Sequence, residues 1–226
     1  MAKEKETGMT GRTIAIGDIH GCSAALSAII KAIDPKPNDT IVTLGDYVDR
    51  GIDSKGVLDQ LIELAGRCRL VPILGNHDDM MLHAGDSERD FQSWMSCGGQ
   101  SALDSYGGTG RLDLIPEAHL RFLAQCISVF ETELHFLVHA NYKPNFRLEQ
   151  LDGLTLRWLS LNDEMPHPHY SRKIAVVGHT PQPEILDVGH LICLDTGCGF
   201  GGWLTAFDVD THQCWQVDEQ GEMRAR

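Results

Sequence analysis

The first third of this 226-residue chain alternates short apolar runs with stretches of helical period, and this alternation limits the fold more than any other feature. The apolar runs are Thr13–Ile16, Thr40–Leu44 and Leu70–Leu74. Short apolar runs bounded by polar residues are typical of buried strands, and a helix between two such strands makes them parallel neighbours in one sheet. We therefore predict an α/β fold that begins with two successive βαβ units.

The two stretches between these runs are predicted to be amphipathic helices. Their apolar residues recur at the spacing of one helix face. The residues on these faces are Leu26, Ile29, Ile30 and Ile33 in the first stretch and Val57, Leu58, Leu61 and Leu64 in the second. Pro35 and Pro37 follow the first face and are expected to end its helix.

The rest of the chain divides into a helical region and a strand-rich region. Residues 79–126 carry helical patterns and many Met, Ser, Gln and Gly residues, which predicts a helical layer beside the sheet. Residues 162–172 are expected to form an exposed loop, because they hold two prolines and two histidines. Strand patterns occur at Glu133–Val138, Ile174–Val177, His190–Leu194, Trp203–Val209 and a final run that ends near Val217.

Length and composition indicate a single globular domain, which we assign to residues 13–226 after a disordered leader over residues 1–12. The leader is charged and lacks the apolar stretch of a secretory signal peptide, and no run of about 18 apolar residues is present to span a bilayer. We therefore expect a soluble, cytoplasmic protein with no membrane partner. Its seven cysteines are an odd number without a CxxC pair, which indicates free thiols in a reducing compartment.

The net charge of -13 bears on the partners of the protein. An acidic surface repels the phosphate backbone that dominates affinity for nucleic acids, so we expect no nucleic-acid partner. An acidic enzyme can still act on phosphate esters if metal ions or arginines neutralise the substrate locally. The polar motifs of this chain offer both.

Three polar motifs begin where predicted strands end: Gly-Asp-Ile-His-Gly at 17–21, Gly-Asp-Tyr-Val-Asp-Arg-Gly at 45–51 and Gly-Asn-His-Asp at 75–78. His139 and His179 follow two later apolar runs in the same way. The carboxyl ends of strands are where open α/β sheets bind ligands, so five strand ends are predicted to direct polar side chains to one location. The alternative is that these residues are ordinary turn and capping residues.

Carboxylate, imidazole and amide oxygen ligands together suit manganese, iron or zinc better than calcium or a thiolate-bound structural zinc. Two such metals about 4 Å apart need a bridging carboxylate, and the pair can activate a water molecule for in-line attack on phosphorus. The sequence therefore indicates a metal-dependent phosphoester hydrolase.

In this combination and order, the five motifs resemble those of the phosphoprotein phosphatase family, within the calcineurin-like metallophosphoesterases. Two further segments, 98–107 and 194–209, are similar to stretches in bacterial Ser/Thr-type phosphatases. The resemblance implies a four-layer αββα sandwich of mixed β-sheets flanked by helices, with the site at the C-terminal ends of strands. It also implies a ligand set in which Asp18 and His20 bind one metal, Asp46 bridges, and Asn76, His139 and His179 bind the other.

The resemblance further implies roles for the residues beside the metals. His77 would protonate the leaving group, Asp49 would orient His77, and Arg50 would bind phosphate oxygens. A second phosphate-binding arginine is expected between His139 and His179. Arg157 is the preferred candidate; Arg147, Arg172 and an ordinary surface role for Arg157 remain open. The chain has Asp78 where many members of the family have glutamate.

We predict a serine/threonine protein phosphatase that uses a metal-bridging hydroxide, two metal ions with Mn²⁺ preferred over iron or zinc, and a phosphorylated protein or small phosphoester as substrate. A monomer or weak oligomer is expected. One alternative is a dinucleoside polyphosphate hydrolase, such as one acting on diadenosine tetraphosphate. Another is an inactive metal-binding scaffold, although such a descendant usually lacks part of the ligand set.

Overall fold

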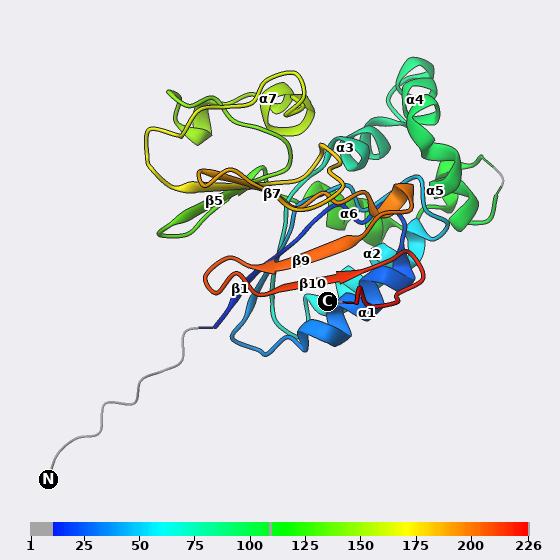
Figure 1. The fold of residues 1–226 in the computed structure, drawn as a ribbon. Coiled ribbons are helices and arrows are strands. Elements are labelled where there is room, and N and C mark those ends of the chain that lie inside the picture. The colour runs from blue at the N-terminus through cyan, green and yellow to red at the C-terminus, as the bar shows by residue number, and fades with distance from the viewer. Residues whose placement is uncertain (1–10, 109, 226) are drawn as a thin grey trace, which may run out of the picture.

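The computed structural model describes residues 11–108 and 110–225, which form two mixed β-sheets flanked by helices (Figure 1). The first sheet has five strands in the order β10-β9-β1-β2-β3. Its strands are β1 (Thr13–Ile16), β2 (Thr40–Thr43), β3 (Arg69–Pro72), β9 (Leu204–Asp208) and β10 (Cys214–Val217). β1, β2 and β3 are parallel, and β9 and β10 run antiparallel beside them. The two predicted βαβ units are therefore confirmed.

The second sheet also has five strands, in the order β4-β5-β6-β8-β7. Its strands are β4 (Val129–Glu131), β5 (His135–Val138), β6 (Ile174–Val177), β7 (Leu186–Asp187) and β8 (Leu191–Cys193). The central three are parallel, and the two edge strands are antiparallel to their neighbours. The predicted strands match within one or two residues, whereas the short edge strands β4 and β7 were not predicted.

Helices cover the outer face of each sheet, so that the molecule has the expected four layers, αββα (Figure 1). The longer helices are α1 (Ser23–Ile33), α2 (Ser54–Leu64), α3 (Asn76–His83), α4 (Glu88–Trp94), α5 (Gln100–Ser105), α6 (Glu117–Ala124) and α7 (Gly153–Trp158). A kinked segment, Met95–Gly99, joins α4 to α5, and short 3₁₀ turns lie at Leu112–Leu114, Leu148–Gln150 and Cys198–Phe200. Helices α3 to α6 form the helical region predicted for residues 79–126.

The alternation of side chains along β1 shows how the layers are built. Ile14 and Ile16 point into the core beneath α1 and α2, while Ala15 points into the core between the two sheets. A strand sends successive side chains to opposite faces, so a continuous apolar run suits a strand buried on both sides. The apolar faces predicted for the first two helices are buried as expected.

A third apolar core lies between the second sheet and α7, where Leu156 packs with Phe136 and Val138 of β5. Residues 162–172 have no helix or strand, as expected. Among the described residues, no helix is both long and apolar enough to cross a bilayer. The leader over 1–12 and the single domain over 13–226 stay predictions; residues 1–10 lie outside the described part of the chain.

Candidate metal centre

The predicted ligands all follow the carboxyl ends of parallel strands from both sheets. Asp18 and His20 follow β1, Asp46 follows β2, and Asn76 begins α3 just after β3. The other two come from the second sheet, where His139 follows β5 and His179 follows β6. Side chains that are up to 161 residues apart in the chain thereby meet at one place.

The backbone at these strand ends is unusual. Eight non-glycine residues in the described part of the chain have positive φ, and five of them belong to the predicted site. The five are His20 (φ 48°), Asp46 (51°), Asp49 (71°), Arg50 (66°) and His179 (64°). A left-handed conformation costs an ordinary residue about 1–3 kcal/mol and persists only where the surroundings enforce it. These five positions lie in the loops that follow β1, β2 and β6, and three of them, His20, Asp46 and His179, carry predicted ligands.

Asp46 lies at the centre of the site and is almost fully buried. Its Oδ2 is 3.5 Å from His20 Nε2, and its Oδ1 is 3.5 Å from His139 Nε2. The backbone N–H of His77 donates to Oδ1 at 3.0 Å. Burial alone would raise the pKa of Asp46, but the surrounding histidines, His139 first, hold it well below its usual range. Asp46 is therefore ionised, with one carboxylate oxygen facing His20 and the other facing His139, which is the arrangement that a bridging ligand needs.

Two groups of donor atoms share Asp46, and in each group all atoms lie within 4.8 Å of one another. One group is Asp46, His139 and His179, and the other is His20, Asp46 and His77. Asn76 Oδ1 extends the first group, because it lies 3.0 Å from both His139 Nε2 and His179 Nδ1. Imidazole, carboxylate and amide oxygen donors converge in this way where a transition-metal ion binds.

The histidines of these groups are prepared to act as ligands. Burial lowers the pKa of His20 and of His139 to about 4, so both rings are neutral at neutral pH. Their second nitrogens are held by backbone carbonyls: His20 Nδ1 lies 3.0 Å from Val48 O, and His139 Nδ1 lies 2.7 Å from Leu44 O. These contacts fix the orientation of each ring with the other nitrogen facing Asp46.

Asp18 lies beside both groups without belonging to either. Its carboxylate is buried and accepts the backbone N–H of His179, at 3.2 Å to Oδ1 and 3.0 Å to Oδ2. Burial raises the pKa of Asp18, and the nearby carboxylates of Asp195 and Asp46 raise it further. A cation would relieve this crowding of buried carboxylates, so the donor set fits a metal centre.

Three predicted catalytic residues lie at the group formed by His20, Asp46 and His77, because Asp49 and Arg50 both contact His77. His77 Nδ1 is 2.7 Å from Asp49 Oδ2, and Arg50 Nη2 is 3.3 Å from His77 Nε2. Asp78 connects the segments that carry Asp49 and His77, because its carboxylate accepts the backbone N–H groups of Tyr47 at 2.9 Å and Gly75 at 3.1 Å. The aspartate at this position thus ties the second motif to the third.

A cleft of about 610 Å³ opens over the site. Arg50 is exposed in it and forms no ion pair with any described residue. Its Cζ lies 4.3 Å from the centre of the Phe200 ring, which is 56% exposed. An aromatic face orients a guanidinium without neutralising it, so the N–H groups of Arg50 stay available for an anion. The cleft is lined by His20, Asp46, Arg50, Asn76, His77, Ser96, Cys97, Gly98, Trp158, His179, Pro181, Asp195 and Phe200.

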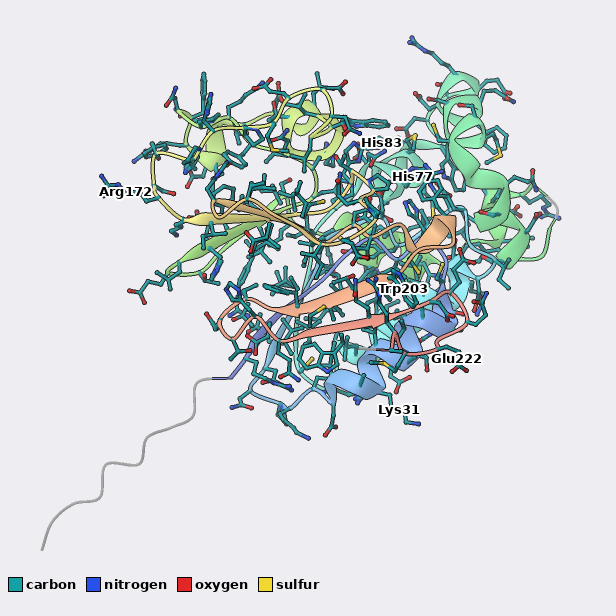
Figure 2. All side chains as sticks on the ribbon, in the orientation of Figure 1. Lys31, His77, His83, Arg172, Trp203 and Glu222 are labelled. Carbon is teal, nitrogen blue, oxygen red and sulfur yellow. The ribbon has the colours of Figure 1, made fainter. Side chains whose placement is uncertain are left out.

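The three candidate arginines for the second phosphate contact are not among the residues that line the cleft. Arg157 Nε is 3.5 Å from Asp79 Oδ2, and its neighbour Trp158 reaches the cleft instead. Arg147 is exposed before the 3₁₀ turn at Leu148–Gln150, and Arg172 lies at the far end of the molecule from His77 (Figure 2). Of the three, Arg157 is the one next to the site.

The sequence analysis missed two buried residues of the site. Trp94 donates its indole N–H to Asp49, and Asp195 lines the cleft with its pKa raised to about 7 by burial. Asp195 follows β8, so the rule that found the ligands, an acid beside a strand end, would also have found it. Nothing in the sequence pairs Trp94 with Asp49, which precedes it by 45 residues.

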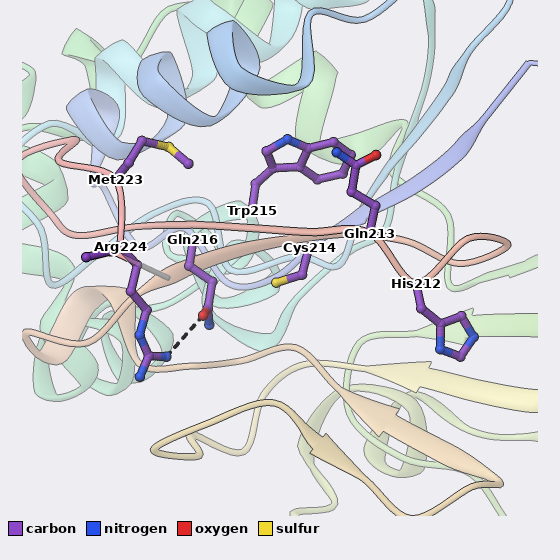
Figure 3. Close-up of a pocket in the computed structure, with 8 residues that line it drawn as sticks. His212, Gln213, Cys214, Trp215, Gln216, Met223 and Arg224 are labelled. Atoms are coloured by element: carbon purple, nitrogen blue, oxygen red, sulfur yellow. Dashed lines mark hydrogen bonds between the residues drawn. The ribbon is translucent and has the colours of Figure 1, made fainter.

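A second hollow, of about 660 Å³, lies along β10 and the C-terminal segment (Figure 3). Arg224 crosses it and donates to Gln216 Oε1 at 3.0 Å. Among residues 11–108 and 110–225, no side-chain carboxylate and none of the predicted ligands lines this hollow. Metal binding and acid catalysis need the carboxylate and imidazole groups that line the cleft, so the cleft is the candidate site.

The two mixed sheets bring together, at their strand ends, two groups of side chains that could hold metal ions, and a buried histidine–aspartate pair lies beside them. This arrangement is that of the metallophosphoesterase class of hydrolases. Residues 11–212 match the calcineurin-like phosphoesterase family, and the chain belongs to that family. The resemblance seen in the motifs is thereby confirmed.

The relatives differ in their substrates. Serine/threonine-protein phosphatase 1 of Salmonella typhimurium is 27% identical over 208 residues, covering 84% of this chain and 88% of that protein. The symmetrical bis(5'-nucleosyl)-tetraphosphatase of an Acidovorax species is 41% identical over 75 residues, covering 33% of this chain and 26% of that enzyme. A crystal structure provisionally described as a diadenosine tetraphosphatase has a TM-score of 0.72 at 24% identity, covering 93% and 94% of the two chains. This structural likeness concerns the fold alone.

We predict that Mn²⁺ stabilises the metal-free protein. A ligand present at 100 times its Kd stabilises the folded state by about 2.7 kcal/mol, which corresponds to a rise in Tm of roughly 5 to 10 °C for a domain of this size. Differential scanning fluorimetry after chelator treatment measures the shift. His139→Ala should abolish it, whereas His212→Ala, at an exposed histidine outside the site, should retain it. An unchanged Tm in the wild type would contradict the metal centre.

Gly178→Ala is predicted to weaken metal binding. A Cβ at this position would lie 2.1 Å from Asp18 Oδ1, so the buried carboxylate would have to move. Gly85→Ala is the matched control, because its Cβ meets only Leu112 Cδ1, at 4.0 Å. Calorimetric titration with Mn²⁺ should give a Kd raised at least tenfold in the first variant, on the order of 1.4 kcal/mol, and unchanged in the second. Equal affinities would show that Asp18 is not needed.

Proposed function

We propose that this metallophosphoesterase removes phosphate from phosphoserine or phosphothreonine in proteins. The observation that carries the proposal is the position of His77, which contacts Asp49 through Nδ1 at 2.7 Å and Arg50 through Nε2 at 3.3 Å while its backbone binds Asp46. A general acid and a phosphate-binding cation therefore stand side by side at the metal centre. The metal ions, when bound, activate water and neutralise the phosphate.

His77 is suited to donate a proton to the leaving oxygen. Asp49 holds Nδ1, so Nε2 faces the cleft, and in the protonated ring Nε2 carries the proton that can be transferred. Arg50 Nη2, 3.3 Å from Nε2, is then proposed to turn towards the phosphate, because both nitrogens are donors. Burial alone would lower the pKa of His77, but Asp46 and the hydrogen bond to Asp49 outweigh it, and the net pKa lies above the usual value. The ring is thereby kept protonated at a pH closer to neutral, as an acid requires.

Arg50 is proposed to bind the phosphate oxygens, because its guanidinium is exposed in the cleft beside His77. Arg157 is proposed as the second phosphate contact, which requires it to exchange Asp79 for the substrate. We propose His20, Asp18 and Asp46 around one cation. The other cation is proposed to share Asp46 with Asn76, His139 and His179.

A protein substrate is favoured by the extent of the sequence matches. The likeness to the Salmonella serine/threonine-protein phosphatase runs through most of both chains, whereas the likeness to the tetraphosphatase covers about a quarter of that enzyme. The second candidate, hydrolysis of dinucleoside tetraphosphates, is supported by the higher identity within that shared segment. An inactive scaffold is disfavoured, because no predicted ligand or acid is missing.

We also propose Mn²⁺ as the physiological metal, the cytoplasm as the compartment, and a monomer or weak oligomer as the working form. No disulfide joins cysteines within residues 11–108 and 110–225, which agrees with a reducing compartment.

His77→Asn is expected to lower kcat on a phosphopeptide about 100-fold or more, since general acid catalysis contributes typically 10² to 10⁴. The metal content should stay at the wild-type level, because the backbone N–H to Asp46 is retained. Steady-state kinetics and elemental analysis of the same preparations measure both quantities. Turnover like that of the wild type would remove His77 as the acid.

A substrate panel separates the two candidate functions. Phosphoserine and phosphothreonine peptides, diadenosine tetraphosphate and p-nitrophenyl phosphate should be compared by kcat/KM at saturating Mn²⁺. We expect the phosphopeptides to exceed the dinucleotide by at least about tenfold, a difference of about 1.4 kcal/mol in transition-state binding. Preference for the dinucleotide would replace the protein substrate, and turnover of no ester by the metal-loaded protein would favour the scaffold.

A further inference from the structure

Asp49 is a fully buried carboxylate whose hydrogen bonds come from only two side chains in the described part of the structure. His77 Nδ1 lies 2.7 Å from Oδ2. The indole Nε1–H of Trp94 is shared between both oxygens, at 3.0 Å to each. No lysine or arginine among the described residues forms an ion pair with Asp49. The indole N–H is thus the second side-chain donor to this carboxylate and the one described side chain that hydrogen-bonds to Oδ1.

The local backbone is adapted to bring the indole to this place. Trp94 is the last residue of α4, and α4 packs beside α3, whose second residue is His77 (Figure 1). A kink over Met95–Gly99 follows at once, with Gly98 at φ 112°. A Cβ at Gly98 would lie 3.6 Å from both Arg50 N and Asp49 Cβ, and one at Gly99 would lie 2.7 Å from the Trp94 ring. The kink at Gly98 separates α4 from α5, and Trp94 at the end of α4 reaches Asp49.

The indole has two physical effects on Asp49. A donor shared between both oxygens fixes the rotation of the carboxylate, so Oδ2 stays directed at His77. Burial raises the pKa of Asp49, and the hydrogen bonds from His77 and Trp94 oppose this rise. Without the indole, a buried carboxylate would lose a donor that water cannot replace at a site with no exposed surface. The hydrogen bond between Asp49 Oδ2 and His77 Nδ1 would then be less well oriented.

We propose that Trp94 is a positioning residue, whose indole N–H orients Asp49 and thereby keeps His77 Nε2 directed at the leaving oxygen of the substrate. This inference rests on the proposed role of His77 as the general acid. Trp94 is not among the residues that line the cleft, so it is proposed to act through Asp49 alone. Its effect should therefore be large when the leaving group needs a proton and small when it does not.

The experiment uses the Mn²⁺-loaded protein and two esters, a phosphoserine peptide, whose leaving alkoxide needs protonation, and 2,4-dinitrophenyl phosphate, whose leaving phenolate does not. Trp94→Phe retains an aromatic ring but has no N–H. Trp94→His has a ring N–H at the equivalent position but leaves a gap where the larger ring was. We expect Trp94→Phe to lower kcat on the peptide about 10- to 100-fold, with KM and the kcat on the aryl ester changed by no more than about threefold. Trp94→His should recover most of the peptide activity, although it is the less stable variant by thermal unfolding.

Three controls separate positioning from packing. Trp215→Phe, at a buried tryptophan of the core beside α1, should leave the ratio of the two kcat values unchanged. Trp94→Phe combined with His77→Asn should be no slower on the peptide than His77→Asn alone, because the two residues act through one proton transfer. Equal losses on both esters, or losses that follow stability, would assign Trp94 to packing and overturn the inference.

The same data distinguish the two possible failures. If His77→Asn itself shows no selective loss on the peptide, the proposed acid role is wrong and the inference falls with it. If His77→Asn shows the selective loss and Trp94→Phe does not, the acid role stands and only the assignment of Trp94 is wrong.

Discussion

The buried carboxylate of Asp46 is the constraint on which the rest of the structure depends. A negative charge out of contact with water is costly unless neighbouring donors and cations compensate for it. The fold supplies one donor, the backbone N–H of His77, and places the unprotonated nitrogens of His20 from the first sheet and His139 from the second 3.5 Å from the carboxylate, where a cation bound between them would compensate for the charge. The ends of four strands, β1, β2, β3 and β5, therefore meet at one place to bring these groups together.

Much of the architecture could be predicted from the sequence, because its signals are local. Apolar runs gave the parallel strands, and the face of Leu26, Ile29 and Ile33 gave the helix between the first two. The edge strands β4 (Val129–Glu131) and β7 (Leu186–Asp187) escaped prediction because runs of two or three residues have no measurable period.

The residues of the site also fall into a part that the sequence predicts and a part that it does not. Its ligands stand beside strand ends and can be read from the sequence, whereas partnerships formed by packing cannot. Trp94 meets Asp49 only because α4 lies against α3, and Phe200 meets Arg50 only because a 3₁₀ turn brings its ring over the guanidinium. The left-handed backbone of Asp49 and Arg50 is also a tertiary property, since an isolated peptide would not maintain it.

The core between the sheets has a consequence for the chemistry. The predicted ligands belong to two separate sheets, and side chains such as Ala15, Val42 and Leu137 set the distance between those sheets. The distance between donor atoms from the two sheets therefore depends on the volumes of apolar side chains in this core, none of which is a predicted ligand. Close-packed interiors transmit a change of one methylene. A change of volume in this core is therefore expected to shift the two sets of donor atoms relative to each other, while every residue of the site stays the same.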